Sequence, residues 1–374
     1  MKYRSIQYIF SWSPLHRRDF LTSSLAVFAA PLIGSAATSG GSKTGILATR
    51  RYSTRVVDLV AESNVIDMLG LLTLDWSLLD RWHQSPDAFT DADFQKLRRS
   101  GINVFHPAVA FDAGQSYEIT RAWFGKWNRL IAGRPDYFLR VDGAGDLARA
   151  KQEGRIGIIL GMQDANHLRS VDDVDAFYQM GQRLTQLTYN TANDLGDGCK
   201  VSRDRGLSAF GHAVVERMNS IGMAIDVSHC GQRTSLDAVA ASKKPVLITH
   251  SNCRALAPGV ARCKPDEVIR AAARSGGVLG ITAVRNFVRA RGTATIEDVL
   301  DHFDHAVKLV GVEHVGLGSD FDLDAHPTYD IPGLNNVNRV YELTDGLLRR
   351  GYTDAHLSLM LGGNFQRALQ QIRV

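Results

Sequence analysis

The sequence predicts an α/β fold, a TIM-like (β/α)8 barrel formed by residues 55–374 as a single domain. Short β-rich runs alternate with helical stretches, which is typical of βα units built around a parallel sheet. Eight such runs can be distinguished, and eight parallel strands close a barrel. Most of them are nearly continuous apolar runs, as expected of strands covered on both faces. The length of 374 residues also suits a barrel of about 250 residues with insertions.

Two segments precede the predicted barrel. Residues 1–37 join Arg17 and Arg18 to an apolar stretch and then to small residues, which is typical of a twin-arginine signal peptide. We therefore expect a periplasmic or otherwise exported protein, with an uncleaved membrane anchor as the alternative. Residues 38–54 are rich in Gly, Ser and Thr and predict a linker.

The charge of the chain gives no support for nucleic-acid binding. Residues 1–37 contain four basic residues and one acidic residue, so they contribute +3 of the net charge of +4. The remaining +1 is too small to indicate an electrostatic surface for nucleic acid.

The predicted strands and helices follow one another along the chain. The strands begin at Val65, Gly101, Arg155, Gln186, Gly222, Pro245, Gly276 and His314. Segments between them carry apolar residues at three-to-four spacing, as amphipathic helices do. These segments are DADFQKLRRS, DAFYQMGQRL, AFGHAVVERMNSI, TSLDAVAAS, PDEVIRAAARS and IEDVLDHFDHAVKLV. The run GVLGITAVRNFV lacks the spacing of a dinucleotide-binding turn, so no nucleotide cofactor is expected.

Metal-ligand side chains follow three of the predicted strands. His229 comes after GMAIDVS, His250 after PVLIT, and Asp320 after HVGLGS. The carboxyl ends of barrel strands converge at one face of the molecule, where active sites lie. Neutral imidazole and carboxylate are ligands that zinc and similar divalent ions prefer. The sequence therefore predicts a metal site at the carboxyl ends of the strands.

Several stretches resemble the membrane (renal) dipeptidase family of metallopeptidases. They are LTYN, GLSAFGHAVVERMNSIGMAIDVSH, PVLITHSNCRAL, ARCKPDEVIRAAARSGGVLGI and EHVGLGSDFD. The resemblance implies a TIM-like barrel with two zinc ions that cleaves dipeptides, including some with D-configured C-terminal residues. It also implies that His229 and His250 bind one zinc, that Arg262 binds the substrate carboxylate, and that Asp320 handles a proton.

The chain departs from the family pattern at three places. Leu69 and Leu71 stand where the family has the His-x-Asp ligands of the other zinc, and leucine cannot bind a metal. Gln163 stands in place of the glutamate that bridges both ions, and a neutral amide oxygen is a weaker ligand. Tyr189 replaces the histidine associated with the oxyanion, although a phenol can still donate a hydrogen bond there.

These departures favour one divalent metal, with zinc as the preferred ion. His229 and His250 would bind it with help from Asp320 or Gln163. Further candidates remain open. Asp67 and Asp226 are interpreted either as ligands or histidine partners, or as buried carboxylates bonded to backbone. His167 is another candidate, whereas the helical pair His302 and His305 is interpreted as structural.

The chain has four cysteines, at positions 199, 230, 253 and 263, all near the predicted mouth of the barrel. For an exported protein the preferred interpretation is one or two disulfides that stiffen the active-site loops. The alternative is a thiolate that joins the metal ligands and favours a softer ion.

The favoured function is a metal-dependent hydrolase that cleaves dipeptides or small amides with a free carboxylate. Metal-activated water would attack, Asp320 would transfer the proton, Tyr189 would support the oxyanion and bind substrate, and Arg262 would bind the carboxylate. One alternative is a one-metal enzyme with non-hydrolytic chemistry on a peptide-derived metabolite. Another is a non-catalytic binding protein. The expected partner is a small peptide-like substrate, and a homodimer is left open.

Overall fold

The computed structural model describes residues 51–111, 113–324 and 331–374. The predicted signal at residues 1–37, and the predicted linker up to residue 50, lie outside these ranges. The domain begins with α2 (Thr54–Glu62), where the Ser53 side chain accepts a hydrogen bond from the amide of Val56. None of the helices within these ranges is both long enough and apolar enough to span a bilayer.

All strand pairs in these ranges are parallel, as the sequence predicts. The strands are β1 (Ile66–Asp67), β2 (Val104–Phe105), β3 (Phe138–Arg140), β4 (Ile156–Ile158), β5 (Leu160–Met162), β6 (Gln182–Gln186), β7 (Ala224–Asp226), β8 (Val246–Ser251), β9 (Leu279–Ile281) and β10 (Val315–Leu317). They form two sheets, with the orders β1-β2-β4-β3 and β10-β9-β8-β7-β6-β5.

Backbone hydrogen bonds join these two sheets at both edges. Only Ile159 separates β4 from β5, so one continuous segment pairs with β2 at its start and with β6 at its end. At the other edge, the amide of Met68 donates to Leu317 O at 3.0 Å, and that of Asp320 donates to Leu69 O at 2.8 Å. With β4 and β5 taken as one strand, the order around the predicted barrel is β1, β2, β4/β5, β6, β7, β8, β9 and β10. Strand β3 lies outside this order.

Three local expectations are wrong. The short run that forms β3 pairs with β4 outside the ring and was not predicted, because three residues give no clear periodicity. β6 ends at Gln186 rather than beginning there, so Tyr189 lies in the loop that follows. The predicted helix DAFYQMGQRL ends at Gln179, because Gly181 takes a φ of 103° and turns the chain into β6.

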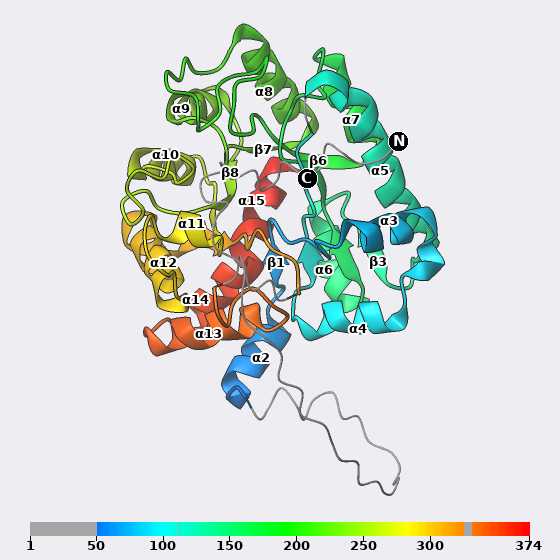
Figure 1. Cartoon of the computed structure of the whole chain (residues 1–374), viewed down its shortest axis with the longest axis vertical. Coiled ribbons are helices and arrows are strands. Elements are labelled where there is room, and N and C mark those ends of the chain that lie inside the picture. Colours follow the sequence, from blue (N-terminus) through cyan, green and yellow to red (C-terminus); the bar gives the residue numbers. More distant parts are fainter. Residues whose placement is uncertain (1–50, 112, 325–330) are drawn as a thin grey trace, which may run out of the picture.

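Helices surround the strands (Figure 1). They are α3 (Trp76–Gln84), α4 (Asp91–Arg99), α5 (Ser116–Gly133), α6 (Ala144–Gln152), α7 (Asp172–Gln179), α8 (Ala209–Ile221), α9 (Gln232–Ala241), α10 (Asp266–Arg274), α11 (Arg285–Val288), α12 (Ile296–Val310), α13 (Arg339–Arg349), α14 (Asp354–Ser358) and α15 (Asn364–Ile372). Shorter turns are η2 (Pro86–Ala88), η3 (Ala113–Gln115), η4 (Val312–His314) and η5 (Leu359–Gly363).

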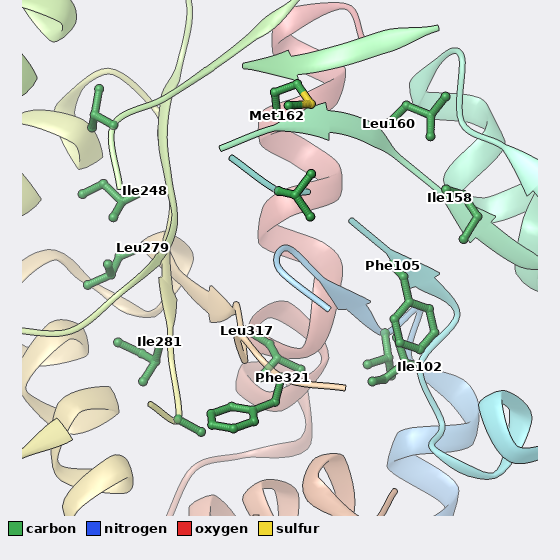
Figure 2. Close-up of a cluster of buried hydrophobic side chains, with 14 of the residues drawn as sticks. Ile102, Phe105, Ile158, Leu160, Met162, Ile248, Leu279, Ile281, Leu317 and Phe321 are labelled. Carbon is green, nitrogen blue, oxygen red and sulfur yellow. The ribbon is translucent and has the colours of Figure 1, made fainter. Parts of the chain in front are cut away.

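The buried apolar residues form two clusters. The larger one includes Phe105, Leu160, Ile248 and Leu279 (Figure 2). It also includes residues of the surrounding helices. The smaller cluster joins strand residues such as Leu184 and Leu247 to Phe365 and Leu369 of α15. Alternate strand residues therefore face opposite layers, as the two-residue period of a strand requires.

Helix α15 covers the amino-terminal end of the barrel. In Figure 1 it runs through the middle of the ring of strands. The Asn364 side chain donates to Val315 O at the start of β10 (2.8 Å), and Arg367 donates to Gly276 O just before β9 (3.0 Å). The opposite end, where the strands terminate, is left for the loops that carry the candidate site.

Candidate functional site

Two histidines from neighbouring strands meet at the carboxyl end of the barrel. His229 follows β7 and His250 lies within β8, and their Nε2 atoms are 3.1 Å apart. His229 Nδ1 lies 3.0 Å from the amide oxygen of Asn190, which can only accept, so Nδ1 is the donor. His229 Nε2 is then left with its lone pair.

The tautomer of His250 is fixed in the same way. Its Nδ1 lies 2.8 Å from the Thr249 hydroxyl, whose own hydrogen is donated to Asp226 Oδ2 at 2.7 Å. Thr249 therefore accepts from His250 Nδ1, and the Nε2 of His250 also carries a lone pair. Two facing lone pairs suit a shared cation, since tetrahedral zinc with Zn–N bonds of about 2.0–2.1 Å places two nitrogens roughly 3.3 Å apart.

The surroundings keep both imidazoles neutral, which is the form that binds a metal. Burial lowers the pKa of His229 well below its usual value, and the positive charge of Arg262 and the neighbouring His250 lower it further. Burial and Arg262 act in the same direction on the pKa of His250. The pair therefore fits one divalent ion.

Asp226 holds the histidine segment in place and does not face the lone pairs. Its Oδ1 accepts from the amide and the hydroxyl of Ser228 at 2.9 and 2.6 Å and from the amide of Thr249 at 3.0 Å. The Ser228 hydroxyl in turn accepts from the amide of His250 at 3.1 Å. Asp226 therefore agrees with the interpretation of a buried carboxylate bonded to backbone, and its link to His250 passes through the hydroxyls of Ser228 and Thr249.

Tyr189 covers one face of His229. The two rings stack with centroids 4.2 Å apart and planes inclined by 26°. Burial raises the pKa of Tyr189, and the negative charge of Asp320 adds to this, while Arg262 opposes it. The phenol therefore stays protonated at neutral pH and remains able to donate a hydrogen bond.

Arg262 lies behind the two histidine segments with a buried guanidinium. Nη1 donates to Ser228 O at 2.7 Å and to the Ser251 hydroxyl at 3.1 Å, and Nη2 donates to His250 O at 2.6 Å. Five N–H donors less these three leave two, one on Nε and one on Nη2. Nε is buried and has no hydrogen-bond partner among the described residues. Such donors suit an anionic group of a ligand.

Asp320 approaches this group from the chain segment after β10. Its backbone has a φ of 64°, a left-handed conformation that aspartate adopts more readily than most residues. Burial raises the pKa of Asp320 to about 7, with Arg262 opposing the rise and Asp67 adding to it. A carboxyl group with this pKa can both accept and return a proton near neutral pH.

Gln163 directly follows β5, and Leu69 and Leu71 follow β1. The Gln163 side-chain amide donates to Ala108 O at 2.9 Å, and its backbone oxygen accepts from Gln186. Leu69 and Leu71 are buried in the apolar core. Over residues 51–111, 113–324 and 331–374, no group of three or more His, Cys, Asp or Glu side chains is arranged to hold a metal. The histidine pair therefore fits a metal ion, whereas Leu69 and Leu71 provide no ligand for one.

The other sequence candidates have structural partners. His167 Nε2 lies 3.1 Å from Gln182 Oε1, away from the histidine pair. Asp67 accepts from the amide and hydroxyl of Ser319 at 2.8 and 2.6 Å and lies 3.6 Å from the buried Arg339. His302 contacts Cys253 N and Val288 O, and His305 contacts Asp266.

All four cysteines are free thiols, so the preferred expectation of disulfides is wrong for this structure. Burial raises the pKa of Cys230 to about 11 and that of Cys263 to about 12, and it also raises the pKa of Cys253. The Sγ of Cys253 donates to His302 O and that of Cys263 to Phe287 O, so these two thiols already have backbone partners. Cys199 is half-buried and donates to Asn190 Oδ1 at 3.4 Å.

Sequence reasoning missed His106, Asn190 and Thr249. His106 directly follows the β2 run, which is the same signal that singled out His250. Its Nδ1 donates to Met68 O at 2.7 Å, and its buried Nε2 has no partner among the described residues. Asn190 and Thr249 are each adjacent in sequence to a candidate, but their hydrogen-bond partners follow from the fold.

A cavity of about 1070 Å³ adjoins the histidine pair. Tyr189 and Asn190, both in contact with His229, form part of its lining. The remaining wall comes from α3, α5 and the loops after β2, β5 and β6. The cavity therefore opens at the end of the barrel that carries the predicted site.

The chain belongs to the membrane dipeptidase family, peptidase family M19, whose model matches residues 53–374. This confirms the resemblance drawn from the sequence. Members of this family are metal-dependent hydrolases in general, and the barrel described above is their fold.

Individual relatives agree with the family assignment. The chain is 28% identical to the dipeptidase aclJ of Aspergillus oryzae over 76% of this chain and 71% of that protein. It is 32% identical to an uncharacterized dipeptidase of Schizosaccharomyces pombe over 69% of this chain and 62% of that protein, so it spans less than two thirds of that relative. The crystal structure of an amidohydrolase from Pseudomonas aeruginosa superposes with a TM-score of 0.75 at 28% identity, covering 85% of this chain and 99% of that one.

Proposed function

We propose that this protein is an exported hydrolase that cleaves dipeptides or similarly small amides with a free carboxylate, using one divalent metal. The observation that carries the proposal is that the Nε2 atoms of His229 and His250 lie 3.1 Å apart. Both carry a lone pair, because each Nδ1 donates its hydrogen, to Asn190 and to Thr249. A metal held by His229 and His250 would lower the pKa of a bound water to about 7. Zinc is the preferred ion for such a nitrogen pair. Export is inferred from Arg17 and Arg18 before an apolar stretch.

The remaining steps belong to side chains of the chain itself. Arg262 would bind the substrate carboxylate through its Nε and Nη2 donors. Asp320 would accept a proton from the attacking water and return it to the leaving amine. The neutral Tyr189 hydroxyl would donate to the oxyanion as the tetrahedral centre forms. Gln163 contributes an amide oxygen as a further candidate ligand, because its nitrogen is already bonded to Ala108 O.

A one-metal enzyme with non-hydrolytic chemistry is the second candidate. It is favoured by Leu69 and Leu71, which are buried where the family has ligands for another ion. In the hydrolytic proposal one ion suffices for water activation, so both candidates share the histidine pair. Products formed from simple dipeptides distinguish them.

The test is elemental analysis together with a dipeptide hydrolysis assay on the same samples. We expect about one zinc per chain, lost together with hydrolysis in the His229→Ala, His250→Ala double variant. His212→Ala is the control, since His212 is an exposed histidine on α8. A protein that binds the metal but does not hydrolyse dipeptides would favour the second candidate, the enzyme with non-hydrolytic chemistry. Two metals per chain would contradict the one-ion proposal.

A further inference from the structure

The cavity beside Tyr189 is larger and more aromatic than a small dipeptide requires. We infer that it binds a large aromatic group on the acyl side of the scissile amide, so that the substrates are aromatic-substituted amides. This inference rests on the proposed function, because it concerns the same site. It goes beyond that function by naming which part of the substrate determines specificity.

Continuity with the histidine pair is the first argument. Tyr189 stacks on His229, Asn190 bonds to His229 Nδ1, and both residues line the cavity. Val109 and Asp164 line it as well, and they follow β2 and β5 at the carboxyl end of the barrel. Neither histidine lines the cavity itself, so a substrate whose amide lies at the histidine pair would extend past Tyr189 to reach it.

The direction of the substrate follows from Arg262. This residue is not among the residues that line the cavity, and its remaining donors suit a carboxylate. If the carboxylate end of the substrate binds Arg262, the cavity receives the opposite end. That end is the acyl half of the amide.

Size is the second argument. Ligand pockets of about 300–1,000 Å³ accommodate drug-sized molecules. The volume of about 1070 Å³ lies just above that range. A dipeptide with small side chains would leave much of this space to water.

The chemistry of the walls is the third argument. Trp76 from α3, Phe111 from the loop after β2, and Tyr117 and Trp123 from α5 all line the cavity. Phe111 and Trp123 meet edge to face with centroids 6.0 Å apart. Aromatic walls favour planar apolar groups, through stacking and burial of apolar area.

Polar groups on the facing wall would orient such a ligand. Asp164 accepts from Asn193 Nδ2 at 2.8 Å and from the amide and side chain of Asn166, both at 3.1 Å. These side chains are fixed by one another before any ligand binds. The cavity therefore combines aromatic side chains on some of its elements with polar and charged side chains on others, and fixed polar groups orient a ligand in a small-molecule site.

Two glycines provide a matched pair of variants. Gly114 lines the cavity, and a Cβ built there would meet nothing within 4 Å. Gly125, on α5, is equally open and does not line the cavity. Gly114→Phe therefore adds a ring at a lining position without a steric clash at Cβ, and Gly125→Phe controls for the added side chain.

The experiment compares binding by calorimetry with hydrolysis in the full chain loaded with zinc. The ligands are N-(indol-3-ylacetyl)-alanine and N-acetyl-alanine, and the substrates are Trp-Ala and Ala-Ala. We expect the indole ligand to bind at least about tenfold more tightly, and Trp-Ala to show a similar advantage in kcat/KM. Gly114→Phe should lower both ratios to about twofold or less, whereas Gly125→Phe should leave them unchanged.

The outcomes separate this inference from the proposed function. Equal binding of the two ligands, or a ratio that survives Gly114→Phe, overturns the inference even if Ala-Ala is cleaved. A binding ratio that disappears in Gly114→Phe supports the inference even if neither dipeptide is cleaved. In that case the proposed hydrolysis fails and the aromatic site stands.

Discussion

At the residue scale, the role of a side chain depends on which of its hydrogen-bonding groups are already in use. Arg262 illustrates this, because three of its five donors hold the backbone and side chains around the two histidines. Nε, buried and without a partner among the described residues, would carry an unmet desolvation cost unless a ligand satisfies it. Arg262 therefore both positions His250 and presents donors to a carboxylate.

An Arg262→Lys variant assayed on an acid substrate and on the corresponding amide should separate these two contributions. Lysine keeps the charge but cannot form the two-pronged contact with a carboxylate. We expect Arg262→Lys to raise KM for Ala-Ala by roughly 10- to 100-fold with a smaller change in kcat, because one or two charge-assisted hydrogen bonds are lost. Steady-state kinetics on Ala-Ala and on its C-terminal amide would measure this. The KM for the amide should change little, because the amide has no carboxylate for Arg262 to bind.

Arg254→Lys is the control for Arg262→Lys. Arg254 donates to Cys263 O and Ala261 O in the same loop, at 2.9 and 3.0 Å. The Arg254→Lys substitution should leave the KM for Ala-Ala unchanged. An equal rise in KM for the acid and the amide would show that Arg262 acts on the fold and not on the carboxylate.

The site residues could be predicted from the sequence where a strand ending or the family resemblance gave a signal. His229 and His250 followed apolar runs, and the structure brings their Nε2 atoms together. Asn190 and Thr249 carry no such signal, because their importance lies in contacts with ring nitrogens that only the fold creates. Equally, no spacing rule could indicate that Arg262 reaches back to Ser228 O.

At the element scale, the position of His250 depends on how closely three neighbouring strands approach. A Cβ built on Gly318, just after β10, would lie 1.9 Å from Thr249 O and 3.1 Å from His250 Cα. One built on Gly280 in β9 would lie 2.0 Å from the same oxygen. Only glycine permits this approach, so these two positions help to set the geometry of the histidine pair.

Gly318→Ala should therefore disturb both stability and metal binding. The methyl group must displace backbone, since the atoms it meets are not flexible side chains. We expect a loss of about 1–3 kcal/mol in the free energy of unfolding, as for other overpacked interiors, together with weaker zinc binding. Urea denaturation and zinc titration would measure the two effects.

Gly145→Ala is the matched control for Gly318→Ala. Gly145 lies in α6, and a Cβ there meets nothing within 4 Å. It should be neutral or stabilising by about 0.5–1 kcal/mol, because alanine is the better helix former. Unchanged stability and zinc affinity in Gly318→Ala would contradict the close approach of the strands.

The elements themselves were partly predictable. Apolar runs and their flanking helices indicated the strands that form the ring, because burial on both faces leaves a clear pattern. No pattern predicted a strand at Phe138–Arg140 or a helix after the strand that begins at His314. Helix α15 covers the amino-terminal end through contacts such as Asn364 with Val315 O, and these follow from the arrangement of the strands in space.

At the scale of the whole molecule, acid stability depends on histidines buried away from the site. Burial lowers the pKa of His83 to about 3 and that of His167 to about 4. His83 lies edge to face with Trp123 and Trp127, at centroid distances of 5.5 and 4.9 Å. Both histidines are neutral in the folded protein and take up a proton on unfolding below pH about 6.5.

The sign of the pH dependence follows from these shifts. Below about pH 6.5 the unfolded chain binds more protons than the folded chain, so stability falls as the pH falls, until the folded pKa is reached. For His83 this amounts to about 2 kcal/mol between pH 7 and pH 5. We expect His83→Leu to reduce the acid-induced loss in the free energy of unfolding by about 2 kcal/mol. Leucine has a similar volume and binds no proton.

Urea denaturation at pH 7, 6 and 5 would measure this contribution. His212→Leu is the control, because His212 is exposed and its replacement should leave the slope unchanged. Both variants keep His229 and His250, so any release of metal in acid contributes equally to each. If His83→Leu shows the same loss of stability between pH 7 and pH 5 as the unmodified chain, His83 does not remain neutral inside the fold, and the acid sensitivity originates at other groups.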